Sequence, residues 1–365
     1  MNMNVETHKR KAFELVTEAL TNLDHYKQSK DRKRLNKAEE QLIAALDEDP
    51  QYLRALYIKG MVSDLQGEGQ KAIDEFEVVL NNEPPFADEV RYNLAVANYH
   101  RYSHEYLDKA IELFNKILKK YASDEEIDLI NVDGNNLELI LLTKAGISQA
   151  YAMHMIPPSP ENPEKGAIQD FYDKSNQQSK IVISYLDSNK NKISSDIYKE
   201  ITWTALNAQG MSRMYYVDYF GENLTEKIKM LEEAFQKLED ADKYNGKDWA
   251  NTCDMGSVQM RLGYWKNALN SEIKKQKENH EKEKDPKWHF EEAIEKLQDV
   301  VNSLRPNYGF ALYEIGRAYR IQGDFINSKI YFEKALEIDS SHRDVSNRRV
   351  EKEISRAENK DSTFP

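Results

Sequence analysis

The sequence is short of cysteine, and this scarcity excludes two classes of protein. Among its 365 residues there is one cysteine, Cys253. A single thiol forms no internal disulfide and builds no multi-cysteine zinc site, so a disulfide scaffold and a zinc finger are both excluded. The simplest interpretation is a reducing, cytoplasmic environment. Because no histidine-plus-carboxylate pattern accompanies Cys253, we interpret it as a small buried residue and not as a nucleophile.

Glycine, proline and long apolar runs are scarce as well. The chain has 14 glycines and 10 prolines, about 7% of its residues, where an average protein has near 12%. Sheet proteins need many tight turns, which draw on these two residues, so the shortage favours an all-α chain. No stretch approaches the roughly 20 apolar residues that cross a membrane. The first residues, MNMNVETHKRKAF, carry charge with no apolar run behind them, so we expect no secretory signal.

Positive charge is in deficit. The chain has 51 lysines and arginines against 63 aspartates and glutamates, which gives a net charge of −12. Proteins that bind nucleic acid neutralise phosphates with a basic excess, so this balance argues against nucleic acid as a partner. The hydrophobic fraction of 40% is too high for a disordered chain and too low for one large core. An elongated helical protein accounts for both facts.

A repeat with a spacing near 34 residues is present in the sequence. Segments 35–51 and 69–85 carry the same order of small and apolar residues. Such residues at positions i, i+4 and i+7 lie on one face of a helix. A period of this length indicates a solenoid, in which two-helix units bury their apolar faces against one another. The matched positions are Ala38, Leu42, Ala45 and Pro50 with Ala72, Phe76, Val79 and Pro84, and later Ala293, Leu297 and Val300 with Ser328, Phe332 and Ala335.

Each of these helices is preceded by another with its own pattern, which is clearest in residues 311–341. Gly316 and Tyr319 lie there at the spacing of a first helix, and a Gly-Asp turn leads to the second. This arrangement resembles the tetratricopeptide repeat (TPR), with leucine in place of the tryptophan of the family signature. A second match covers residues 53–86, and a third, over 94–117, fits with a longer loop. The resemblance implies a right-handed superhelical solenoid of six or seven antiparallel helix pairs with a C-terminal capping helix.

The centre of the chain departs from the repeat. The stretch 156–166 holds four prolines and is therefore predicted to be an inserted loop. The stretch 271–287 is charged on all sides, as a solvated extension or loop would be. Residues 362–365 are expected to be disordered. The predicted parts are an N-terminal TPR-like block at 1–122, divergent helical repeats at 123–248, a C-terminal TPR-like block at 249–345 and the capping helix at 346–361.

No catalytic or metal-binding pattern is more convincing than a plainer interpretation of the same residues. His100 and His104 lie four positions apart, a spacing that places two imidazoles toward a metal on a helix. No His-Glu-x-x-His order accompanies them, so a polar helix end is the simpler interpretation. Glycine motifs that hold phosphate are missing too. The sequence therefore predicts a protein that is not an enzyme and has no cofactor or metal.

The TPR resemblance implies a binding surface instead. In that family the first helices of the pairs line a concave groove that holds a segment of a partner protein. Tyrosine and arginine often dominate binding energy, although such tyrosines also pack between helices with only the hydroxyl in water. A carboxylate clamp of the kind found in some family members is not expected, since Tyr57 and Met61 replace its lysine and asparagine. Alignment with the family places in the groove Tyr57, Met61, Asp64, Tyr92, Asn93, Val96, Tyr99, Tyr313, Arg317 and Arg320.

From these observations we predict a cytoplasmic adaptor or scaffold that binds a segment of a partner protein without making or breaking bonds. The alternative is a regulatory sensor that responds to a ligand or peptide and acts on a separate effector chain. The partner in the first case is another protein or peptide segment, with no membrane involved. A homo-oligomer is compatible with the sequence.

Overall fold

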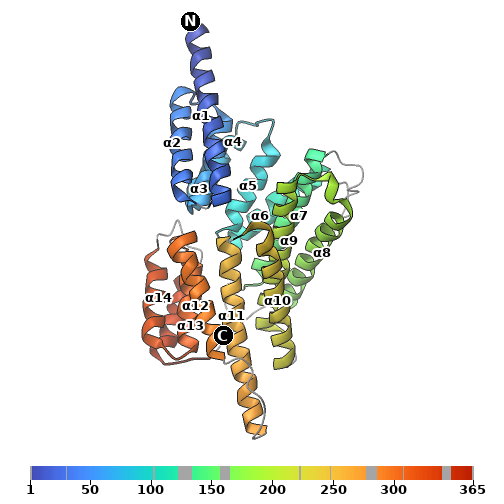
Figure 1. Cartoon of the computed structure of the whole chain (residues 1–365), viewed down its shortest axis with the longest axis vertical. Helices are drawn as coiled ribbons and strands as arrows, with labels where there is room; N and C mark the ends of the chain where they lie inside the picture. The colour runs from blue at the N-terminus through green and yellow to red at the C-terminus, as the bar shows by residue number, and fades with distance from the viewer. Residues whose placement is uncertain are drawn as a thin grey trace. The chain divides into compact units, whose positions relative to one another are not determined.

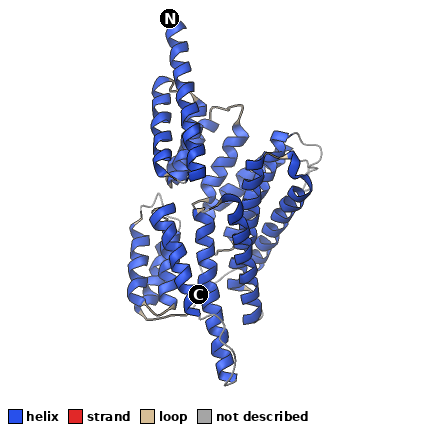
Figure 2. Cartoon of the chain, in the orientation of Figure 1, coloured by secondary structure: helices blue, strands red, loops and turns tan. Residues whose placement is uncertain are grey.

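Helices make up almost all of the computed structural model of this protein (Figure 2). No strand occurs in the residues that the structure describes. The all-α class predicted from the shortage of glycine and proline is therefore confirmed. No helix in the described part of the chain combines the length and the apolar character that a membrane crossing needs. The described residues are 2–29, 31–101, 103–121, 134–156, 165–221, 223–246, 248–276, 286–306, 308–338 and 347–363.

The chain folds into two compact units, Met1–Arg101 and Tyr102–Pro365. In the first unit, neighbouring helices pack in chain order, with α1 against α2, α3 against α4 and α4 against α5 (Figure 1). The helices of this unit are α1 (Asn2–Ser29), α2 (Arg32–Glu48), α3 (Leu53–Gln66), α4 (Gly69–Leu80) and α5 (Ala87–Tyr99).

The second unit continues the same pattern of paired helices. Within it α7 packs against α8 and α9, and each later helix packs against the next, up to α15. A short 3-10 helix, η1 (Lys190–Lys192), follows α8, and a π-helical segment, η2 (Val300–Leu304), continues α12. The helices are α6 (His104–Tyr121), α7 (Gly134–His154), α8 (Lys165–Asn189), α9 (Ser195–Tyr219), α10 (Leu224–Asn245), α11 (Trp249–Gln276), α12 (Pro286–Asp299), α13 (Gly309–Ile321), α14 (Phe325–Glu337) and α15 (Asn347–Glu358).

The repeat residues act in the same way in both units. A side-chain carbon added at Gly60 of α3 would lie 2.6 Å from the Phe76 ring of α4, and one added at Gly316 of α13 would lie 2.6 Å from the Phe332 ring of α14. Both rings are buried. Glycine is required at these positions because the paired helices approach too closely for any side chain. In both of the best-matched repeats, a glycine of the first helix thus packs directly against a phenylalanine ring of the second helix.

Turn residues end the first helices as the pattern predicts. Gly67 closes α3 in the left-handed conformation with φ of 88°, and Gly323 adopts φ of 84° between α13 and α14. Residues other than glycine rarely adopt these angles. The Asp324 carboxylate then caps α14 by accepting a hydrogen bond of 3.1 Å from the Asn327 backbone N–H. These local signals fix where each pair of helices turns.

The C-terminal end differs in part from the prediction. α15 packs against α14 as a terminal helix, in keeping with the predicted capping role. Residues Ser362 and Thr363 were expected to be disordered, and this is wrong, because arginines of α13 and α15 bind the backbone carbonyl of Thr363. Residues 364–365 lie outside the described residues.

The predicted division into four parts stays a prediction. The two compact units meet between Arg101 and Tyr102, inside the first predicted block. The expected boundary at 122/123, most of the loop at 156–166 and much of the charged stretch at 271–287 lie outside the described residues. The start of that charged stretch, up to Gln276, is helical and belongs to α11.

Candidate binding site

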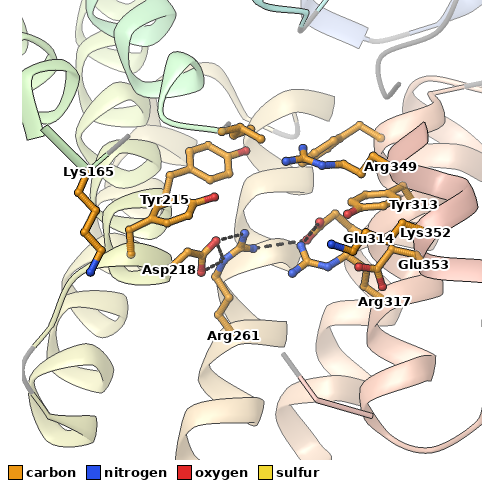
Figure 3. A pocket seen from close by; sticks show the side chains of 13 residues that line it. Lys165, Tyr215, Asp218, Arg261, Tyr313, Glu314, Arg317, Arg349, Lys352 and Glu353 are labelled. Carbon is orange, nitrogen blue, oxygen red and sulfur yellow. Dashed lines mark hydrogen bonds and ion pairs between the residues drawn. The ribbon is translucent and has the colours of Figure 1, made fainter. Parts of the chain in front are cut away.

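The second unit contains a cavity of about 310 Å³ between α9, α11, α13 and α15 (Figure 3). Three of these helices, α9, α11 and α13, are the first helices of their pairs. First helices are the ones that the TPR resemblance predicts to line a groove. Its lining residues are Ile156, Lys165, Tyr215, Asp218, Tyr219, Arg261, Phe310, Tyr313, Glu314, Arg317, Arg349, Lys352 and Glu353.

Aromatic side chains form part of the lining. Tyr215, with 2% of its surface exposed, has a hydroxyl with no hydrogen-bond partner among the described residues. Burial raises the pKa of Tyr215 well above its ordinary value, and burial raises the pKa of Tyr313 to about 12. Both phenols therefore stay protonated at neutral pH and are able to donate a hydrogen bond into the cavity.

A buried ion-pair network connects three helices across the cavity. Arg261 of α11 binds Asp218 of α9 through Nε, 3.0 Å from Oδ1, and through Nη2, 2.8 Å from Oδ2. Its Nη1 also lies 3.4 Å from Oε2 of Glu314 in α13, and Arg317 Nη1 donates to Glu314 Oε1 at 2.7 Å. The two-pronged geometry matches the fork of a guanidinium to a carboxylate. The network fixes the spacing of α9, α11 and α13.

Glu314 is ionised within this network. With 1% of its surface exposed, burial alone would raise its pKa, but Arg317 and Arg261 together hold the pKa below its ordinary value. The same attraction acts on Arg261, where burial opposes the charged form and Asp218 and Glu314 nevertheless raise the pKa. Glu314 and Arg261 are therefore both charged at neutral pH.

The lining carries a surplus of positive charge. Its described residues include five lysines and arginines against three carboxylates, a surplus of two. Each of the three carboxylates already accepts hydrogen bonds from arginine. Glu353 is bound by Arg320, 2.7 Å from Nε, and lies 3.4 Å from Nη1 of Arg356. A negatively charged group that enters the cavity thus meets carboxylates whose charge is compensated.

A row of buried polar side chains lies on the same first helices. Gln149 of α7 donates to the Asn207 carbonyl of α9 at 2.7 Å, and the Asn207 amide donates to Asp254 of α11 at 3.0 Å. Burial raises the pKa of Asp254 to about 7, although the hydrogen bond from Asn207 opposes the rise. The row connects α7, α9 and α11 through directional bonds that an apolar core lacks.

Two of the three groove residues predicted in the second unit line the cavity, namely Tyr313 and Arg317. They lie one turn apart on α13, with the Arg317 guanidinium carbon 5.6 Å from the centre of the Tyr313 ring. Arg320 is fully buried and does not line the cavity. It binds Glu353 and the backbone carbonyls of Asp361 and Thr363, at 2.5 and 2.8 Å. Arg320 thus connects α13 with the C-terminal helix.

In the first unit the predicted groove residues occupy α3 and α5. The Asn93 amide donates to the Tyr57 hydroxyl at 2.7 Å, and Asp64 lies 3.1 Å from Nδ1 of His100, so these pairs are brought together. Tyr57 is buried, with 5% of its surface exposed, and packs against Phe86. The remaining predicted residues are Tyr99, which is buried, and Met61, Tyr92 and Val96, which are half-buried.

Several lining residues were missed by the sequence analysis, among them Tyr215 and Arg261. Both lie five positions after a first-helix glycine, Gly210 in α9 and Gly256 in α11. Aligning these glycines with each other would have placed the two side chains at equivalent positions. Arg349 gave no such signal, because it lies on the capping helix outside the repeat.

The two histidines considered for a metal do not act together. His100 lies beside Asp64, whereas His104 Nε2 lies 2.5 Å from the backbone carbonyl of Ile156. Among the described residues, no group of three or more histidine, cysteine, aspartate or glutamate side chains is arranged to hold a metal ion. Cys253 forms no disulfide and is buried in the core cluster around Leu297.

Comparison with known proteins identifies repeats at both ends of the chain. Models described as Tetratricopeptide repeat match residues 31–85 and 311–342. No curated protein sequence matches the chain. The matched segments are those in which the 34-residue pattern is clearest.

Solved structures with similarity to the chain include a tetratricopeptide repeat protein from Parabacteroides merdae, at 12% identity and a TM-score of 0.44, with 96% of this chain and 99% of that one covered. A monomeric mutant of IFIT1, solved with Gppp-AAAA, is 13% identical with a TM-score of 0.39, covering 93% of this chain and 70% of that one. Yeast Tom70 is 12% identical with a TM-score of 0.24, covering 94% and 95%.

Proposed function

We propose that this chain, which belongs to the tetratricopeptide repeat proteins, is a cytoplasmic adaptor that binds a segment of a partner protein along the first helices of its second unit. Binding, and not a chemical reaction, is its activity. The cavity between α9, α11, α13 and α15 receives side chains of the bound segment.

The observation that carries this proposal is the place of the cavity. Tyr313 and Arg317, selected from the sequence as groove residues, both line it. The volume of about 310 Å³ is at the lower end of the range for ligand pockets, roughly 300–1,000 Å³. It accommodates a few side chains and excludes a folded domain. A segment lying across the first helices fits this size.

The chemistry of the lining also supports recognition of a protein. Tyrosine and arginine are enriched among residues that dominate protein interfaces, and three tyrosines and three arginines line this cavity. The ion pairs between Asp218, Arg261, Glu314 and Arg317 hold the surface in one arrangement before a partner arrives. Such preorganisation lowers the entropy cost of binding.

We propose a separate binding surface within the first unit, taken by itself. Met61 on α3 and Tyr92 and Val96 on α5 are half-buried, so part of each side chain is accessible. The buried tyrosines Tyr57 and Tyr99 instead shape the helix packing beneath them. We expect Tyr92→Ala to weaken partner capture, and Tyr99→Ala mainly to lower stability.

Site-specific photo-crosslinking tests the proposal. A photoreactive phenylalanine derivative is placed at position 219, on the cavity lining, and in a matched chain at position 326 on α14. Ile326 is 79% exposed and does not line the cavity. After irradiation in the native host, we expect a cross-linked protein from position 219 and none from position 326. The same partner cross-linking from position 326 alone would contradict the proposal.

A further inference from the structure

The cavity of the second unit has the chemistry of a receptor for a negatively charged oxygen group. We infer that it binds one oxyanion, a carboxylate or phosphoryl group on a side chain of the bound segment, through the Tyr215 hydroxyl and the Arg349 guanidinium. This inference rests on the proposed function, since the oxyanion is taken to belong to the partner segment. It adds the chemical class of side chain that the cavity selects.

The first support is that each carboxylate of the lining is already paired with an arginine. Asp218, Glu314 and Glu353 accept hydrogen bonds from Arg261, Arg317 and Arg320, with nitrogen–oxygen distances of 2.7 to 2.8 Å. Their negative charge is balanced within the fold. Lys165, Arg349 and Lys352 also line the cavity, so that its lining holds five cations against three carboxylates and the potential within it is positive.

The second support is Tyr215. Its hydroxyl is buried, lines the cavity and has no hydrogen-bond partner in the described part of the chain. Figure 3 shows the hydroxyl directed from α9 toward the side of the cavity formed by α13 and α15. Buried polar groups are normally satisfied, so an unsatisfied donor at the wall of a cavity marks a place for an acceptor. An oxyanion is the strongest acceptor that a phenol meets.

The third support is the position of Arg349. Arg349 lines the cavity together with Tyr219 and Tyr313. Its positive charge acts on both phenols, opposing the rise in pKa that burial causes in each. Tyr219 belongs to α9 and Tyr313 to α13, and Arg349 itself belongs to α15. The guanidinium and the Tyr215 hydroxyl therefore face one space from opposite sides (Figure 3). An oxyanion between them receives hydrogen bonds from both.

The size of the cavity fits an anionic side chain. About 310 Å³ holds one acidic or phosphorylated side chain with part of its neighbours. The aromatic walls, Phe310 and Tyr313, cover the carbon atoms of such a side chain. A cationic group is disfavoured, because it would meet the surplus of positive charge.

Titration calorimetry of the full chain with small probes tests the inference. Glutarate supplies a carboxylate, inorganic phosphate supplies the other oxyanion, and glutaramide is a neutral analogue of glutarate. We expect saturable binding of at least one oxyanion and at least about tenfold weaker binding of glutaramide. The probe that binds more tightly shows whether the cavity takes a carboxylate or a phosphoryl group of the bound segment. Equal binding of glutarate and glutaramide with no binding of phosphate, or no saturable binding at all, would overturn the inference.

Variants locate the binding. Arg349→Gln is expected to weaken oxyanion binding at least about tenfold, and Tyr215→Phe, which keeps the ring, about fivefold. Lys334→Gln removes the same charge from an exposed position on α14 and is expected to change affinity less than about twofold. If Arg349→Gln fails to fold, Lys352→Gln replaces it. Equal losses in Lys334→Gln and the cavity variant would mean that the anions bind nonspecifically, and would refute the inference.

This test is separate from that of the proposed function. A partner that cross-links from position 219 while the cavity variants bind oxyanions as the wild type does would refute the inference and leave the proposed function intact. Oxyanion binding at the cavity without any partner cross-linking from position 219 would support the inference about the cavity and contradict the adaptor function.

Discussion

At the scale of the residue, buried charged side chains of this protein stay ionised because they are paired with one another. Arg317 and Glu314 lie in the second unit with 4% and 1% of their surface exposed, yet both are ionised because each compensates the other. Alignment with the TPR family, which the sequence resembles, predicted Arg317 as a groove residue. Its partner Glu314 lies one turn away on the same helix and was assigned no role. Arg261, which binds Glu314 in turn, lies on α11, and one sequence gives no distances between helices. Local patterns therefore select single residues but not networks.

Asp254 gives a testable consequence of burial. Its pKa is raised from 3.8 to about 7, so the folded chain keeps a proton that the unfolded chain releases. The stability that this proton contributes is complete below about pH 4 and is lost as the pH rises through 7. Asp254→Asn has no such proton. Its free energy of unfolding, relative to wild type, should rise by about 2 kcal/mol between pH 5 and pH 8.

Urea denaturation at the two pH values measures this difference. Asp47→Asn, at an exposed position, is the matched control and should leave the pH dependence of wild type unchanged. If the difference in free energy of unfolding between Asp254→Asn and wild type is the same at both pH values, the buried carboxyl does not titrate as described.

At the scale of the element, glycine sets how closely paired helices approach. Gly316→Ala would place its new carbon 2.6 Å from the buried Phe332 ring, and we expect a loss of about 1–3 kcal/mol of stability from overpacking. Gly166→Ala, at an exposed position in the first turn of α8, would meet no neighbouring side chain within 4 Å among the described residues. It should instead leave stability unchanged or raise it by up to about 1 kcal/mol. Thermal unfolding of the two variants measures the contrast. Equal effects would contradict the close-packing role of Gly316.

Arg320 holds the C-terminal helix α15 in place, so replacing this side chain should destabilise α15. Arg320→Met removes the bonds to Glu353 and to the carbonyls of Asp361 and Thr363. We expect a loss of about 3 kcal/mol of stability, because a buried pair loses one partner. Amide exchange in α15 should become faster while exchange in α7 stays the same.

The control for Arg320 is an exposed ion pair to the same helix. Lys329 lies 2.7 Å from Glu358 of α15, with 43% of its side chain exposed. Lys329→Met should cost less than about 1 kcal/mol, since exposed pairs contribute little. If both variants loosen α15 to the same extent, burial of Arg320 is not what secures the helix.

Helices were the part of this fold that the sequence predicted best. The spacing around Gly316 predicted a pair of helices with a turn at the Gly-Asp sequence, and Gly323 lies at that turn with a positive φ, because both glycine positions have strict local requirements. The anchoring of Thr363 was missed. It depends on Arg320, which lies 43 residues earlier and had been assigned to the groove.

At the scale of the whole molecule, the period of 34 residues predicted the all-α repeat architecture but not its division. The two compact units meet between Arg101 and Tyr102, within the third repeat predicted from the sequence at 94–117. A repeat pattern reports similarity between segments, and it carries no information on where contacts between successive segments become sparse. Nor does it identify the partner, because groove side chains vary without changing the period.

The central claim is that a partner segment lies along the first helices of the second unit. Hydrogen–deuterium exchange of the chain, alone and in complex with the partner identified by cross-linking, tests it most directly. We predict slower exchange in α9, α11, α13 and α15 in the complex, with α10, α12 and α14 unchanged. Slower exchange confined to α10, α12 and α14 would contradict the claim.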